Sequence, residues 1–203
     1  MLYSPDRGRT ELGYSGIRIA VIYGFLAREF VGRHLLRFLR DTGYPDTTLY
    51  GHLFPVARIA DDLEQAAREG RPIALVGFSQ GGFQAVKVAR ALHKRGIEVK
   101  LVVTIGSGGM GRLLPRQWGF NPRQVPPNIM TCLNYFSEGD ALGADKRFDK
   151  NLLMPGSPEQ TIENYGFPKG SQVSHFDLIT CYPADRVHPE VRSRLLERLV
   201  EAL

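Results

Sequence analysis

The sequence predicts an α/β protein in which helices cover both faces of a mainly parallel sheet. Short apolar runs rich in β-branched residues alternate with longer segments whose apolar residues recur at helical spacing. Strands that alternate with helices favour right-handed crossovers, and such crossovers produce parallel strands. The 203 residues, 43% of them hydrophobic, suffice for one large core. We therefore expect a single domain at 17–203 after a polar, Gly-rich lead-in at 1–16.

The predicted strands and helices alternate along the chain, and most of them end at a glycine. The runs at 17–23 and 99–105 are almost continuously apolar, which is typical of strands buried on both faces. In order, the expected elements are strands at 17–23, 47–54, 73–78, 99–105 and 128–136, and helices at 26–42, 59–69, 80–95 and 189–203. Two segments, 107–127 and 141–170, fit neither pattern, and their length indicates functional loops or lids.

A Gly-x-Ser-x-Gly pentapeptide lies where the strand at 73–78 meets the following helix. In a nucleophile elbow the serine occupies this sharp turn, and small residues on both sides let strand and helix cross closely. Gly77 and Gly81 are these small residues, and Ser79 is the predicted nucleophile. The pentapeptide also occurs by chance in many proteins, so the prediction depends on the strand before it and the helix after it.

A serine hydroxyl needs a histidine base, and the histidine needs a carboxylate to orient it. Enzymes with such an elbow carry these residues in the order Ser, acid, His. Asp140 follows the predicted strand at 128–136, and His175 precedes the final helix. Ser79, Asp140 and His175 are therefore the predicted catalytic residues, and Glu138, on the same turn as Asp140, is the alternative acid.

The remaining histidines fit the role of base less well. His34 and His93 lie within helical patterns, His52 precedes the elbow, and His188 borders the last helix, where it helps the helix start. Asp177 is too close in sequence to the predicted base to be the acid.

Acyl transfer develops negative charge on an oxygen, which two preorganised N–H donors must stabilise. The backbone N–H of Gln80, directly after the nucleophile, is one predicted donor. The loop after the strand at 17–23 should supply the other, and Phe25 is our choice, with Leu26 next. The alternative for Phe25 is a core aromatic, whose backbone would still donate.

From residue 17 to the end, the arrangement resembles a compact α/β hydrolase of the lipase, esterase and thioesterase kind. Residues 77–82 are similar to the elbow of acyl-protein thioesterases and related carboxylesterases, and 102–106 resemble the strand and turn that lipases carry after the elbow helix. Residues 23–25 occupy the place of a His-Gly-x oxyanion segment, with Tyr23 in place of the usual histidine. The resemblance implies an α/β-hydrolase fold and leaves the subfamily open.

The two irregular segments carry more large apolar residues than a polar surface loop needs. These residues are Leu113, Leu114, Trp118, Phe120, Leu152, Leu153 and Met154. We expect them, above all Trp118, Leu113 and Leu114, to bind the acyl group or form its lid. Longer acyl chains should then be better substrates, because each buried methylene contributes about 0.8 kcal/mol. The alternative is that these residues pack on the domain or on a second subunit.

The leading hypothesis is a serine hydrolase that cleaves a small-molecule carboxylic ester or thioester through an acyl-enzyme, without a metal or cofactor. The alternative is a hydrolase-fold binding protein that has lost catalysis, against which the ordered Ser, Asp and His argue.

The composition of the sequence indicates which classes of binding partner and which cellular location to expect. The net charge of +5 comes from scattered arginines without a dense basic run, which argues against nucleic acid and leaves peripheral contact with anionic lipid open. The sequence has neither a Sec signal nor an apolar run long enough to span a membrane, so we expect a cytoplasmic protein. Cys132 and Cys181 form no disulfide framework and should be reduced. The oligomeric state is left open.

Overall fold

Six parallel strands form the central sheet of the computed structural model, which describes residues 4–8, 13–113, 121 and 123–203. The strands are β1 (Arg18–Tyr23), β2 (Thr47–Gly51), β3 (Ile73–Phe78), β4 (Val99–Ile105), β5 (Ile129–Ser137) and β6 (Thr161–Phe167). Their order across the sheet is β2-β1-β3-β4-β5-β6. The central strand β3 is buried along its whole length, as its continuous apolar run predicts.

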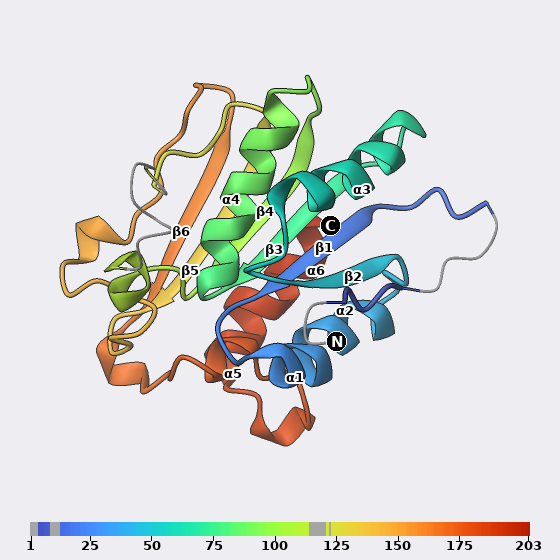
Figure 1. Cartoon of the computed structure of the whole chain (residues 1–203). Coiled ribbons are helices and arrows are strands. Elements are labelled where there is room, and N and C mark those ends of the chain that lie inside the picture. Colours follow the sequence, from blue (N-terminus) through green and yellow to red (C-terminus); the bar gives the residue numbers. More distant parts are fainter. Residues whose placement is uncertain (1–3, 9–12, 114–120, 122) are drawn as a thin grey trace.

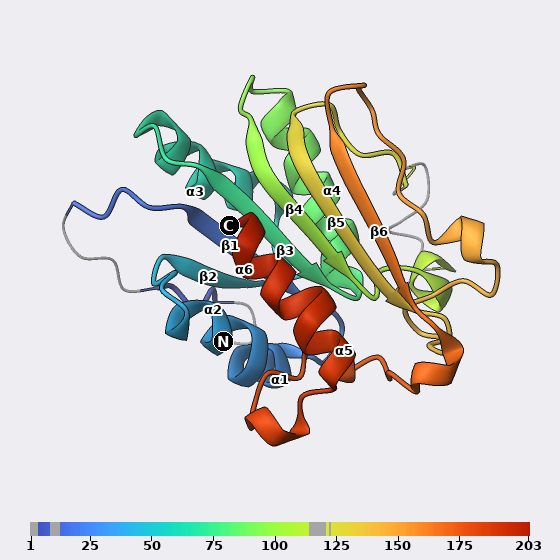
Figure 2. The ribbon, with the colours of Figure 1, turned by 180° about the vertical axis from the view of Figure 1, so that it is seen from behind.

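Helices cover both faces of this sheet (Figure 1). Two of them are α3 (Val56–Arg68) and α4 (Gln80–His93), and their apolar residues share one core cluster with one face of the strands. The opposite face packs against two composite helical stretches, which Figure 2 shows from behind. The first consists of α1 (Arg28–Val31), a π-helical turn η1 (Gly32–Leu36) and α2 (Arg37–Asp41), and the second of α5 (Pro189–Val191), a π-helical turn η8 (Arg192–Leu196) and α6 (Glu197–Ala202).

Short 3₁₀ turns occupy the loops. They are η2 (Gly109–Leu113), η4 (Phe148–Lys150), η5 (Lys169–Ser171), η6 (Asp177–Ile179) and η7 (Ala184–Arg186). Most of them lie between the carboxyl end of one strand and the next element, which is the edge of the sheet where α/β proteins place their sites.

Each predicted strand and helix is present, but one strand was missed. Residues 161–167, part of the segment 141–170 that we expected to be a loop or lid, form the edge strand β6. Only Phe167 of this strand is buried, because one side of an edge strand has no neighbour. The apolar run that identifies a central strand is therefore missing from its sequence. Residue Asp6 of the lead-in also pairs with the sheet, through an antiparallel bridge to Leu49 on the opposite edge.

None of the helices in the described part of the chain is long and apolar enough to cross a membrane.

Candidate active site

Ser79 lies on a sharp turn between β3 and α4, with φ 55° and ψ −124°. This is a strained backbone conformation for a residue with a side chain, and nucleophile elbows require it. A Cβ on Gly77 would lie 2.5 Å from the carbonyl oxygen of Gly81, and a Cβ on Gly81 would collide with the carbonyl oxygen of Ile22. Both glycines are therefore needed for the close crossing of α4 over the strands, as the sequence predicts.

Hydrogen bonds from β4, from the residue Ser107 and from α4 hold the backbone of this turn in place. The Ser79 N–H donates to the carbonyl of Ile105 at 2.8 Å, and the Ser107 hydroxyl donates to the carbonyl of Ser79 at 3.0 Å. The N–H of Gly82 donates to the same carbonyl at 3.0 Å. None of these bonds uses the Ser79 hydroxyl, so they leave it available for chemistry.

The predicted base and acid contact each other directly. His175 Nδ1 lies 2.5 Å from Asp140 Oδ2, and both residues are buried. The other carboxylate oxygen accepts the backbone N–H of Leu142 at 3.0 Å. With the ring N–H at Nδ1 donated to the carboxylate, Nε2 carries the lone pair that a general base needs.

The imidazole ring of His175 lies beside the elbow. Its centroid is 4.7 Å from that of Phe78, the residue before Ser79. A Cβ on Gly106 would lie 2.9 Å from His175 Cε1, and Gly106 directly follows Ile105, which binds the Ser79 backbone. Within the described residues the Ser79 hydroxyl makes no hydrogen bond to the imidazole. Such bonds commonly tighten only when substrate is present.

Of the two acids that the sequence left open, Asp140 is the one that contacts the imidazole. Glu138 is exposed, whereas Asp140 turns back under the loop, and its N–H donates to the Ser137 carbonyl at 3.0 Å. The Ser137 hydroxyl also donates to the Val173 carbonyl at 2.6 Å. This bond ties the end of β5 to the segment that carries His175, and it brings Asp140 rather than Glu138 to the imidazole.

The end of β1 passes directly against the elbow. A Cβ on Gly24 would lie 2.7 Å from the Cβ of Ser79 and 2.9 Å from the backbone nitrogen of Gln80. Phe25 and Leu26 follow at once, on the same edge of the sheet. The Phe25 side chain is exposed, so the alternative that it is a core aromatic is wrong. Its backbone remains the candidate oxyanion donor beside that of Gln80.

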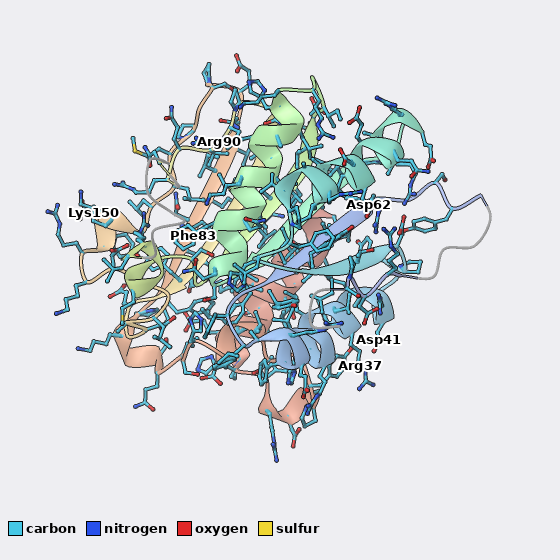
Figure 3. All side chains as sticks on the ribbon, in the orientation of Figure 1. Arg37, Asp41, Asp62, Phe83, Arg90 and Lys150 are labelled. Atoms are coloured by element: carbon cyan, nitrogen blue, oxygen red, sulfur yellow. The ribbon has the colours of Figure 1, made fainter. Side chains whose placement is uncertain are left out.

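The Gln80 side chain has a separate role, which the sequence did not suggest. It is buried, and its amide Nε2 donates to the carbonyl of Gly111 at 2.8 Å. A Cβ on Gly111 would lie 2.6 Å from that nitrogen and 3.1 Å from the ring of Phe83 on α4, which Figure 3 labels. Gln80 therefore fastens the turn η2 to the start of the elbow helix.

Of the residues expected to bind the acyl group, Leu113 lies on η2 with its side chain exposed. Leu153 is buried in the core cluster shared with α3 and α4, where it packs on the domain, and Met154 is exposed. Leu152 is partly buried, and the remaining residues of this group, Leu114, Trp118 and Phe120, lie outside the described residues.

The other histidines and the cysteines take structural roles where the structure describes their partners. His34 Nδ1 accepts the backbone N–H of Cys181 at 3.2 Å, and burial, helped by the nearby Arg33, lowers its pKa. His188 caps α5, as predicted for the start of the last helix, by accepting a backbone N–H.

Burial raises the pKa of the Cys132 and Cys181 thiols to about 12, so they are poor nucleophiles. Within the described ranges, no three His, Cys, Asp or Glu side chains group as metal ligands would.

Gly143 lies next to the contact between Asp140 and His175, so a side chain added there tests that contact. A Cβ there would lie 2.5 Å from Asp140 Oδ2 and 2.7 Å from His175 Nδ1. We expect Gly143→Ala to lower kcat by about 10²-fold, because a displaced histidine loses its orientation toward the substrate. The matched control is Gly139→Ala, where the new methyl would meet only Lys169 Cγ at 3.9 Å. Circular dichroism should show both variants folded, and full activity in Gly143→Ala would contradict this geometry.

Comparison with known proteins gives a match to one family model. Residues 53–110, which contain the elbow, match the family model described as a thioesterase domain. No curated protein matches the sequence at a significant level.

Similar solved structures span nearly the whole chain. RedJ, a thioesterase of prodiginine biosynthesis from Streptomyces coelicolor, is 15% identical with a TM-score of 0.56, and the match covers 96% of this chain and 91% of that one. Human thioesterase 2 is 11% identical with a TM-score of 0.57 over 93% and 96%. XC6422 from Xanthomonas campestris, described as a serine hydrolase without a lid, is 15% identical with a TM-score of 0.52 over 98% and 85%. The chain therefore has the α/β-hydrolase fold that its sequence predicts.

Proposed function

We propose that this protein is a serine hydrolase that cleaves a carboxylic ester or thioester. The observation that carries the proposal is a buried Asp140–His175 pair beside a serine held at positive φ on an elbow. The thioesterase match around the elbow and the thioesterases among the structural neighbours support the same class of enzyme. Each of the three residues occupies the carboxyl edge of the parallel sheet, where such sites lie.

In the first half of the reaction, His175 Nε2 accepts the proton of the Ser79 hydroxyl as its oxygen attacks the substrate carbonyl carbon. Asp140 holds the imidazole through Nδ1 and stabilises the positive charge that the ring acquires. The bond to the leaving alcohol or thiol then breaks, and the imidazolium returns the proton to that group. An acyl ester of Ser79 remains.

The tetrahedral intermediate carries a negative oxygen, for which the backbone N–H groups of Gln80 and Phe25 are the proposed donors. Gly24 contributes by being small, because a side chain there would press on the Gln80 nitrogen. In the second half of the reaction, His175 Nε2 accepts a proton from water as the water oxygen attacks the acyl carbon. The bond between that carbon and Ser79 Oγ then breaks, the imidazolium returns the proton to Oγ, and the carboxylic acid leaves. The chemistry requires no group beyond these residues and water.

The proposed substrate is a small acyl compound. In support, RedJ has been solved with a polyethylene glycol molecule in its active site, which shows that a slender flexible chain fits a site of this fold. Whether the leaving group is an alcohol or a thiol depends on the substrate and not on the triad, since the same acyl-enzyme forms from either.

A stopped-flow experiment with p-nitrophenyl acetate tests the proposal. We expect a burst of p-nitrophenol that approaches one equivalent per protein, followed by slower turnover, because p-nitrophenol is a good leaving group and hydrolysis of the acyl-enzyme is then the slower step. A parallel assay with an acyl thioester and a thiol-reactive dye compares the two leaving groups. The alternative, a hydrolase-fold binding protein without catalysis, predicts no burst and no turnover with either substrate.

A further inference from the structure

Leu26 has a backbone conformation that its side chain does not favour. Its φ is 54°, in the left-handed region where glycine and asparagine are tolerated and leucine is strained. Residues 24–27 form a four-residue turn in which the Ala27 N–H donates to the Gly24 carbonyl at 3.4 Å. Leu26 is the third residue of this turn, the position at which a turn with positive φ normally carries glycine.

Packing within the chain does not explain the leucine. Its side chain is 90% exposed, so it contributes almost no buried apolar area to the fold. Glycine or asparagine would serve the same turn with less strain. A strained residue kept at such a position indicates that its side chain acts on something outside the folded chain.

The turn that carries Leu26 lies close to the predicted nucleophile and base. Two residues earlier, a Cβ on Gly24 would lie 2.7 Å from the Cβ of Ser79 and 2.9 Å from the nitrogen of Gln80. One helical turn later, the ring of Phe30 lies 5.0 Å from that of Phe176, which follows His175. The turn that carries Leu26 is thus fixed between the elbow and the histidine segment, on the edge of the sheet where substrate must approach Ser79.

We infer that Leu26 determines acyl-chain specificity, its exposed side chain packing against the apolar chain of a substrate bound at Ser79. This inference rests on the proposed hydrolase function. It assigns part of the acyl contact to the turn after β1, whereas the sequence suggested only the segments at 107–127 and 141–170. The strain at Leu26 is retained because the apolar contact improves the binding of longer acyl chains.

The test compares two variants on p-nitrophenyl acetate and p-nitrophenyl octanoate. Leu26→Asn keeps the side-chain size, suits the left-handed backbone and removes the apolar surface. We expect its Tm to rise by about 2–4 °C as strain is relieved. The ratio of its kcat/KM for octanoate to its kcat/KM for acetate should fall about tenfold. Leu26→Met restores an apolar chain and should keep the octanoate-to-acetate ratio of the wild type.

Several results would overturn the inference. An unchanged octanoate-to-acetate ratio in Leu26→Asn would show that Leu26 makes no acyl contact. Equal losses on both esters would assign Leu26 to the oxyanion turn instead, and a lower Tm would mean that it packs in the fold. If the wild type hydrolyses neither ester and shows no burst, the proposed function itself is wrong, and the inference about Leu26 fails with it.

Discussion

Replacing Ser79 with alanine is expected to lower kcat/KM for p-nitrophenyl acetate by about 10³-fold or more, because the variant has no nucleophile to form an acyl-enzyme. The fold should survive the change. The hydrogen bonds that hold the elbow join the backbone of Ser79 to Ile105, Ser107 and Gly82, and alanine keeps that backbone. Thermal unfolding followed by circular dichroism should therefore give a Tm close to that of the wild type.

Ser107 provides the matched control for this variant. Its hydroxyl lies next to the elbow and donates to the Ser79 carbonyl at 3.0 Å, so Ser107→Ala removes one supporting hydrogen bond and no nucleophile. A net loss of about 1 kcal/mol in stability is the expected cost of one such bond. Activity should fall far less than in Ser79→Ala. The reverse order of the two activities would show that the elbow serine is not the nucleophile.

Asp140→Asn is expected to lower kcat by about 10²–10⁴-fold, because an amide in place of the carboxylate neither fixes the right imidazole tautomer nor stabilises its charge. Steady-state kinetics on a short p-nitrophenyl ester, with KM nearly unchanged, would check this. The side-chain size stays the same, so the buried position remains filled.

Glu138→Gln is the matching control on the same turn. Glu138 is exposed, and the structure shows it two residues from the carboxylate that contacts His175. We expect this variant to keep activity to within about twofold, as do most surface substitutions of this kind. If Glu138→Gln lost more activity than Asp140→Asn, the assignment of the acid would be wrong.

The elements that could be predicted from the sequence are those whose burial requires a regular pattern of apolar residues. The strands β1, β3 and β4 are buried on both faces, so their residues form continuous apolar runs with clear ends. The helices on both faces repeat their apolar residues at helical spacing. Strand β6 carries no such signal, because it lies at the edge and its Thr161, Glu163 and Asn164 are not buried. Local pattern is a weak guide for an edge strand.

Part of the candidate site could also be predicted from the sequence, and part could not. Ser79 could be predicted because its glycine neighbours have a fixed spacing. Asp140 and His175 could be predicted because they follow the order Ser, acid, His that enzymes with such an elbow share. The close approach of Gly143 to the Asp140–His175 pair could not be predicted from the sequence. It depends on how the turn after β5 folds back onto a histidine distant in sequence. The strain at Leu26 is equally hidden, because a leucine after a strand usually signals a helix or a core residue. Both features required three-dimensional geometry.

The most direct measurement of the central claim is covalent labelling with a fluorophosphonate, read by intact-protein mass spectrometry. Such a probe reacts with a serine only when a base activates the hydroxyl and an oxyanion site accepts the phosphoryl oxygen. The proposed mechanism predicts one adduct on the wild type, located by peptide mapping at Ser79. It also predicts no adduct on Ser79→Ala and slow labelling of His175→Ala. An adduct on Ser79→Ala as rapid as on the wild type, or no adduct on the folded wild type, would contradict it.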